Sequence, residues 1–152
     1  MDPIHVKSAL YQACKAYVAQ RIATAKEALA EAKEAAAEET KSSAGDKYET
    51  GRAMAQLDEE RALGQLAEAN KLADALATIP QGKKNEEVQP GSLVITPQGH
   101  YFMGVSVGKV TEEGQDYFVI APSSPIGQVL LGAKPGETVS FQGRTIAIQE
   151  VY

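Results

Sequence analysis

The stretch Ser42-Ser43-Ala44-Gly45-Asp46-Lys47-Tyr48-Glu49 interrupts a region that otherwise has the composition of a helix from residue 4 to residue 79. Serine, glycine and aspartate favour caps and turns over helix interiors, and this stretch gathers several of them. On both sides of it, alanine, glutamate, lysine and glutamine dominate, and these residues are strong helix formers. We therefore expect two helices joined by one turn, folded as an antiparallel coiled-coil hairpin.

Apolar residues on the first arm recur at spacings of three and four, which predicts a narrow seam against the second arm. The seam shrinks to alanine toward the turn, and Pro80 ends the second helix. The predicted seam residues are Tyr11, Cys14, Val18, Ile22, Ala25, Leu29, Ala32 and Ala36 on the first arm, and Met54, Leu57, Leu63, Leu66, Leu72, Leu76 and Ile79 on the second.

The alternative to a hairpin is one continuous helix that runs through Gly45 and pairs in parallel with a second copy. Such a helix would form a long parallel dimer. A purely structural coiled-coil protein is a separate alternative for the function, and it predicts a stable dimer in solution. For the hairpin we expect a monomer. Arms of roughly 35–40 residues would reach about 50–60 Å, which would carry the residues at the turn far from the rest of the chain.

The composition and the residue pattern of the sequence change after the second arm. Residues 80–90 form a polar stretch that we expect to be a linker, and short segments rich in valine, isoleucine, tyrosine and phenylalanine follow it. We expect strands at 92–96, 101–107, 117–121, 138–141 and 145–151, and a short helix that Ser124-Pro125 opens and Gly132 ends. The fold class is therefore α+β, with a helical hairpin at 1–79, a linker at 80–90 and a small β-rich domain at 91–152.

Charge and composition exclude several classes of protein. The net charge of −5 disfavours tight, non-specific nucleic-acid binding, which needs clustered cations. No apolar run approaches the ~20 residues of a membrane span, and residues 1–5 do not begin a signal peptide. Cys14 is the single cysteine, so no intramolecular disulfide can form, and we expect it to be a buried structural thiol. These features favour a cytoplasmic protein without a membrane segment.

Two carboxylates, Asp46 and Glu49, lie three residues apart at the expected start of the second helix. In one interpretation they form a capping box, in which Asp46 accepts a first-turn N–H and Glu49 reaches back. In the other they share a hard divalent cation such as Mg²⁺, with the remaining ligands supplied by a partner. The neighbouring Tyr48 and Arg52 are candidate contacts to nucleic acid or to a substrate phosphate. His5 and His100 are too far apart in the expected fold to share a metal.

The C-terminal half contains Ser124-Pro125, then six residues, then Gly132-Ala133-Lys134-Pro135-Gly136-Glu137. Together with Gly45-Asp46-x-x-Glu49 and the closing residues 146–152, this string resembles the Gre transcript-cleavage factors of bacterial RNA polymerase. The resemblance covers most of the chain in architecture, and it is strong in residues over 124–152 and 45–49. It implies an N-terminal coiled-coil hairpin followed by an FKBP-like domain.

The resemblance also implies a mechanism. The C-terminal domain of that family docks at the secondary channel of RNA polymerase, partly through the loop that matches Ser124, Pro125 and Ile126. The hairpin enters the channel, where acids corresponding to Asp46 and Glu49 help to hold the second catalytic Mg²⁺ near the RNA 3′ end. The polymerase itself then cleaves backtracked RNA. The chain would thus be an accessory elongation factor, not an enzyme, and its Mg²⁺ would belong to the polymerase active site.

Some residues depart from the family pattern and leave two other functions open. Thr50-Gly51-Arg52-Ala53 stands where the family usually has Asn-Ala-Glu-Tyr, and Gly51 weakens a helix by roughly 1 kcal/mol. A protein that binds the same channel and modulates or inhibits transcription without cleavage is the first alternative. The second is an FKBP-like prolyl isomerase or chaperone, whose pocket would draw on the aromatic residues Tyr101, Phe102, Tyr117, Phe118 and Phe141.

Overall fold

The computed structural model describes residues 2–41 and 46–152, with the backbone alone for residues 39–41 and 46–49. The chain divides into two compact units. We call Val18–Asp74 the helical unit, and Met1–Tyr17 together with Ala75–Tyr152 the sheet unit. A helical hairpin followed by a β-rich region makes the chain α+β, as the sequence predicts.

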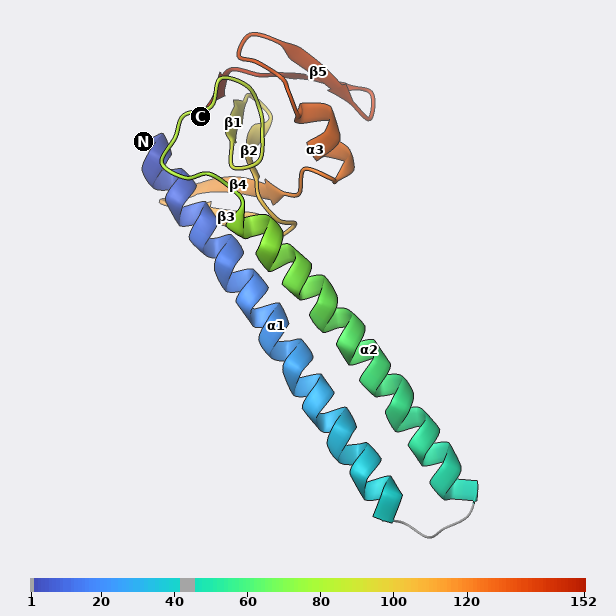
Figure 1. Ribbon diagram of the computed structural model, residues 1–152. Helices are drawn as coiled ribbons and strands as arrows, with labels where there is room; N and C mark the ends of the chain where they lie inside the picture. Colours follow the sequence, from blue (N-terminus) through green and yellow to red (C-terminus); the bar gives the residue numbers. More distant parts are fainter. Residues whose placement is uncertain (1, 42–45) are drawn as a thin grey trace. The chain divides into compact units, whose positions relative to one another are not determined.

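The two long helices are α1 (Pro3–Lys41) and α2 (Asp46–Ala77), shown in Figure 1. Helix α1 ends directly before the predicted interruption and α2 begins within it, at Asp46, so the alternative of one continuous helix is wrong. Gly45 itself lies outside the described residues. At the start of α1, the Asp2 carboxylate accepts the N–H of Ile4 at 3.1 Å, and Pro3 occupies the first helical position, where a missing N–H costs nothing.

In the helical unit, the buried residues of each helix recur every seven positions, which returns them to the same face. On the part of α2 that belongs to this unit, the buried residues of the repeat are all alanines. Met54, Leu57 and Leu63 lie off the repeat and are 56%, 53% and 47% exposed, so their predicted place in the seam is wrong. The buried repeat residues are Val18, Ala25 and Ala32 on α1 and Ala55, Ala62 and Ala69 on α2. Among the described residues, no helix combines the length and the apolar character needed to cross a membrane.

The sheet unit contains a five-stranded sheet in the order β3-β4-β2-β1-β7 and a separate hairpin of β5 and β6. Strands β2 and β4 pair in parallel, with Tyr101 opposite Phe118, and the other pairs are antiparallel. The strands are β1 (Leu93–Thr96), β2 (Gly99–Met103), β3 (Gly108–Glu112), β4 (Gln115–Ile120), β5 (Thr138–Phe141), β6 (Arg144–Ala147) and β7 (Glu150–Val151).

Two predicted strands differ from the structure. The strand expected at 101–107 ends at Met103, and a separate strand, β3, follows that the sequence reasoning missed. The strand expected at 145–151 is two strands, because the chain passes there from the small hairpin to the large sheet. Ile148 donates its N–H to the Glu137 carbonyl at 2.8 Å, and Gln149 donates to the Ile95 carbonyl at 2.9 Å. These two bonds show that the chain crosses from the small hairpin to the large sheet between Ile148 and Gln149.

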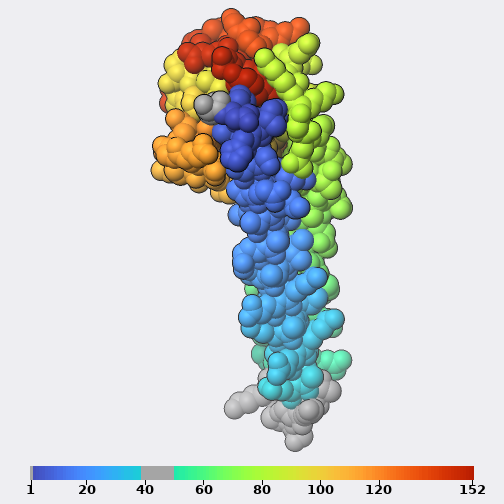
Figure 2. All heavy atoms as spheres, turned by 90° about the vertical axis from the view of Figure 1, so that its left-hand side faces the viewer, coloured from blue at the N-terminus to red at the C-terminus, as the bar shows by residue number. Residues whose placement is uncertain are grey.

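Both faces of the large sheet are covered within the sheet unit. On one face, α3 (Pro125–Leu130) and the β5–β6 hairpin pack over a core that includes Val94, Met103 and Leu130. On the other face lie the first turns of α1. A Cβ at Gly104 would come within 2.8 Å of the Cys14 sulfur, so the helix and the strand connection are in close contact there. Figure 2 shows the start of α1, in dark blue, against the residues of the sheet.

The segment expected to be a linker contributes to the sheet unit. Val88 is buried and exchanges backbone hydrogen bonds with residues after α3, donating to the Ala133 carbonyl at 2.9 Å and accepting from Gly132 at 2.8 Å. Asn85 is also buried, and its side chain donates to the Ser92 hydroxyl at 3.0 Å. Residues 80–90 are therefore polar in composition but partly packed.

Candidate functional site

The predicted acidic pair falls where the structure gives only the backbone. Helix α2 begins at Asp46, as the Asp-x-x-Glu spacing predicts, and continues through Glu49. The side chains of Asp46, Tyr48 and Glu49 lie outside the described residues, so their assignment as metal-assisting or contacting groups stays a prediction. Arg52, the other candidate contact, is exposed on α2.

The loop that was predicted to contact a partner forms a tightly held corner at the start of α3. Ser124 is the N-cap: its hydroxyl accepts the N–H of Gly127 at 3.1 Å and donates to the Ala121 carbonyl at 2.6 Å. Pro125 is the first residue of the helix, where its fixed φ suits helical geometry. We call residues 121–127 the Ser-Pro corner. Its hydrogen bonds hold the backbone before and after Pro125 and thereby orient the side chain of Ile126.

The Ser-Pro corner is too tight for any side chain at Gly127. A Cβ built there would lie 2.2 Å from the Ala121 carbonyl oxygen and 2.9 Å from the Pro122 carbonyl oxygen. Both are backbone atoms, which cannot move aside cheaply. Glycine at this position therefore lets the chain double back against itself.

Beside the Ser-Pro corner lies an apolar groove of about 350 Å³. We call it the docking groove, after the role proposed for it below. Its lining residues come from the turn after β1, from β2, β4, β6 and α3, so it gathers parts of the sequence that are far apart. They are Gln98, Tyr101, Phe118, Ile120, Ile126, Arg144 and Ile146. Of the predicted partner-binding residues, Ile126 lines the groove, while Ser124 and Pro125 hold the corner that presents it.

Phe118 is the apolar residue that this groove exposes most clearly. It is 40% exposed, although its neighbours Tyr117 and Val119 on β4 are buried on the opposite face of the sheet. The ring of Tyr101, on the adjacent parallel strand, lies with its centroid 5.8 Å from that of Phe118. The two ring planes are tilted by 35°. Neighbouring aromatic residues at an open surface are typical of protein contact sites.

The rim of the docking groove is polar. Gln98 donates its amide N–H to the Thr145 carbonyl at 3.2 Å, which ties the turn after β1 to β6. Arg144 begins β6 and brings a positive charge to the lining. An apolar floor with a polar rim is the general layout of a protein interface.

Among the described residues, three side chains of types that can ligate a metal lie close together: His5, Glu112 and Glu113. One ligand atom from each lies within 4.8 Å of the others, and His5 Nε2 is 3.7 Å from Glu113 Oε1. His5 and Glu113 are exposed, and an exposed ion pair of this kind contributes little to stability. His100 is not in the group, since its ring lies against Tyr117 at 5.8 Å between centroids.

Cys14 is buried, as predicted. Burial raises the pKa of its thiol above the ordinary value of 9.0, and a hydrogen bond with the Val105 backbone opposes part of this rise. The thiol therefore stays protonated at neutral pH, which is the state of a structural cysteine and not of a nucleophile.

Comparison with known proteins gives distant relatives only. No family model matches the chain. Uncharacterized proteins of Mycobacterium bovis and Mycobacterium tuberculosis are 31% identical to it over 102 residues. The matched part is 64% of this chain and 62% of each relative, so the chain spans less than two thirds of the curated relatives it matches.

Proposed function

We propose that the protein is a Gre-like transcription factor that binds bacterial RNA polymerase at its secondary channel and stimulates cleavage of backtracked RNA. In this proposal the sheet unit, which we take to be FKBP-like, docks on the polymerase through the docking groove and the Ser-Pro corner. The helical hairpin reaches the active site. The chain itself is an accessory factor, and the polymerase performs the hydrolysis.

The observation that carries the proposal is the position of Ile126. The Ser-Pro string, which is the most specific part of the resemblance, forms a rigid corner that holds Ile126 at the docking groove. The groove adds the exposed ring of Phe118 and a mostly apolar lining around a volume of about 350 Å³. A loop of this kind beside such a groove suits the recognition of a protein segment.

The role proposed for Asp46 and Glu49 follows from their spacing at the first turn of α2. Carboxylates are preferred ligands of Mg²⁺, and two of them added to a partner's ligands can hold a second metal and orient a water. Hydrolysis of a phosphodiester bond is helped by two metals that stabilise the attacking and the leaving oxygens. The pair would supply negative charge to a metal that the polymerase already binds in part.

A transcript-cleavage assay tests this function. A backtracked elongation complex with a labelled RNA is incubated with Mg²⁺ and the protein, and the RNA length is measured. We expect the wild-type protein to shorten the RNA from its 3′ end, and the conservative variants Asp46→Asn and Glu49→Gln to lose at least about tenfold in rate, since each removes a metal-assisting charge. Glu60→Gln, an exposed change elsewhere on α2, is the matched control.

Gly51 favours one other candidate function, a channel-binding modulator without cleavage. Gly51 lies inside α2, two residues after Glu49, and glycine weakens a helix interior. A weakened first turn would hold the acidic pair less firmly. In the same assay this candidate predicts polymerase binding and altered transcription with no shortened RNA, and no effect of Asp46→Asn.

A further inference from the structure

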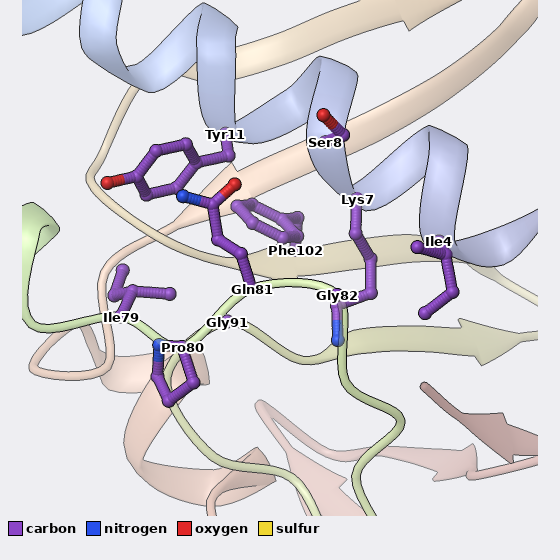
Figure 3. Close-up of a pocket in the computed structure, with 10 residues that line it drawn as sticks. All are labelled: Ile4, Lys7, Ser8, Tyr11, Ile79, Pro80, Gln81, Gly82, Gly91 and Phe102. Atoms are coloured by element: carbon purple, nitrogen blue, oxygen red, sulfur yellow. The ribbon is translucent and has the colours of Figure 1, made fainter.

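A second cavity of the sheet unit lies between the first turns of α1 and the loop that follows α2 (Figure 3). Its volume is about 350 Å³, at the lower end of the range of about 300–1,000 Å³ that small-molecule sites occupy. Phe102, which follows Tyr101 on β2, lines this cavity, and successive strand residues point to opposite faces. The cavity is therefore on the other side of the sheet from the docking groove.

The chemical feature of this cavity is a buried ammonium group. Lys7 lines it and is only 5% exposed. Its Nζ donates to the backbone carbonyl of Lys83 at 2.6 Å. A lysine ammonium has three donors, and in the described part of the chain no carboxylate forms an ion pair with this one.

A buried cation without a countercharge is costly, because the surroundings do not replace the solvation that water gives it. Burial accordingly lowers the pKa of Lys7 from its ordinary value of 10.5. An anion bound beside the ammonium would offset that cost and would engage the donors that the Lys83 carbonyl does not use. The charge of the cavity thus favours an acidic ligand.

The walls indicate what the rest of that ligand is like. Ile4, Ile79 and Phe102 make much of the lining apolar. Tyr11 presents its ring, since its hydroxyl is already bonded to the Leu76 carbonyl at 3.2 Å. Figure 3 shows the Gln81 amide, which comes from the loop after α2, extending toward the side of the cavity where Tyr11 and Phe102 lie. A ligand with an apolar body suits these surroundings.

We propose that this cavity binds a small organic acid, with its carboxylate at the Lys7 ammonium and its apolar body among Ile4, Ile79 and Phe102. The site is independent of the proposed polymerase function, because it uses neither the docking groove nor the acidic pair.

The test compares two probes with the same apolar body and nearly the same shape, the anion 4-methylpentanoate and the neutral 4-methylpentanamide, added at pH 7 to the full chain labelled with ¹⁵N. Amide chemical shifts are followed in two-dimensional NMR spectra. We expect saturable shifts at Ile4, Lys7, Gln81 and Gly82, and at least about tenfold tighter binding of the acid, since only its carboxylate adds the attraction of opposite charges to the hydrogen bond with the ammonium. Equal binding of the two probes, or no saturable shift at these residues, overturns the proposal.

Variants locate the effect. Lys7→Met keeps the length of the side chain and removes its charge, so the preference for the acid over the amide should disappear. Lys15→Met, an exposed change on the same helix, should leave that preference intact. A folded Lys7→Met protein that still prefers the acid overturns the proposal. The wild-type comparison of the two probes decides by itself if Lys7→Met does not fold.

Discussion

At the scale of single residues, two glycines, one within the short helix α3 and one just after it, illustrate different needs for glycine. Gly127 stands in the Ser-Pro corner against the backbone oxygens of Ala121 and Pro122. Gly132, a few residues later, has a positive φ of 82° but open space around it. The two positions therefore need glycine for different reasons, one for lack of room and one for backbone conformation.

Replacing these glycines by alanine should separate the two reasons. Gly127→Ala should destabilise the protein by about 3 kcal/mol or more, because its Cβ meets a carbonyl oxygen that the Ser124 cap holds in place. Gly132→Ala should cost only about 1–2 kcal/mol, the penalty of a left-handed conformation. Urea unfolding of the three proteins measures both. Equal losses would contradict the tight packing of the Ser-Pro corner.

Cys14 gives stability a defined pH dependence. Well below pH 9.0 the thiol is protonated in both the folded and the unfolded state. As the pH rises through this value, the unfolded thiol ionises before the buried one, whose pKa is raised, so the unfolded state is stabilised relative to the folded state. The stability of the wild type relative to Cys14→Ala should therefore fall between about pH 8.5 and 10, by up to about 1.4 kcal/mol per pH unit. The free energies of unfolding of the two proteins are measured with urea across this pH range. A difference that stays constant with pH would contradict the predicted effect of the Cys14 thiol.

At the scale of elements, the helical unit shows what periodicity can and cannot predict. Most of the seam on α1 could be predicted from the sequence, because Tyr11, Cys14, Val18, Ala25 and Ala32 are buried, while Ile22, Leu29 and Ala36 are half-buried. On α2 the large apolar residues gave a wrong prediction of the buried face. Met54, Leu57 and Leu63 are exposed, while alanines at seven-residue spacing are buried. Alanine occurs on every face of this helix, so its hydrophobicity alone does not indicate which face packs.

A charge placed on the alanine repeat tests that assignment. Ala69 is fully buried and Ala67, two residues earlier on the same helix, is exposed. Ala69→Asp should destabilise by about 3 kcal/mol or more, since it buries a carboxylate without a partner. Ala67→Asp shares the lower helix propensity of aspartate and should cost below about 1 kcal/mol. Far-UV circular dichroism with urea measures the difference. Similar losses for the two would contradict the seven-residue seam.

At the scale of the whole molecule, the sequence predicted the α+β class, the two helices with their interruption, and the short α3 with its Ser124 cap. It did not predict the docking groove as a unit. That groove depends on the parallel pairing of β2 with β4, which places Tyr101 beside Phe118. The pairing follows from the insertion of β3 between them in sequence, and β3 was itself missed. The Lys7 cavity likewise depends on contacts between distant segments.

The most direct test of the central claim is the affinity of the protein for bacterial core RNA polymerase, measured by biolayer interferometry. Phe118→Ala and Leu131→Ala form a matched pair, because both side chains are 40% exposed and only Phe118 lines the docking groove. We predict that the wild type binds, that Phe118→Ala weakens binding by about tenfold or more, and that Leu131→Ala changes it little. Absence of wild-type binding, or equal effects of the two variants, would contradict the account.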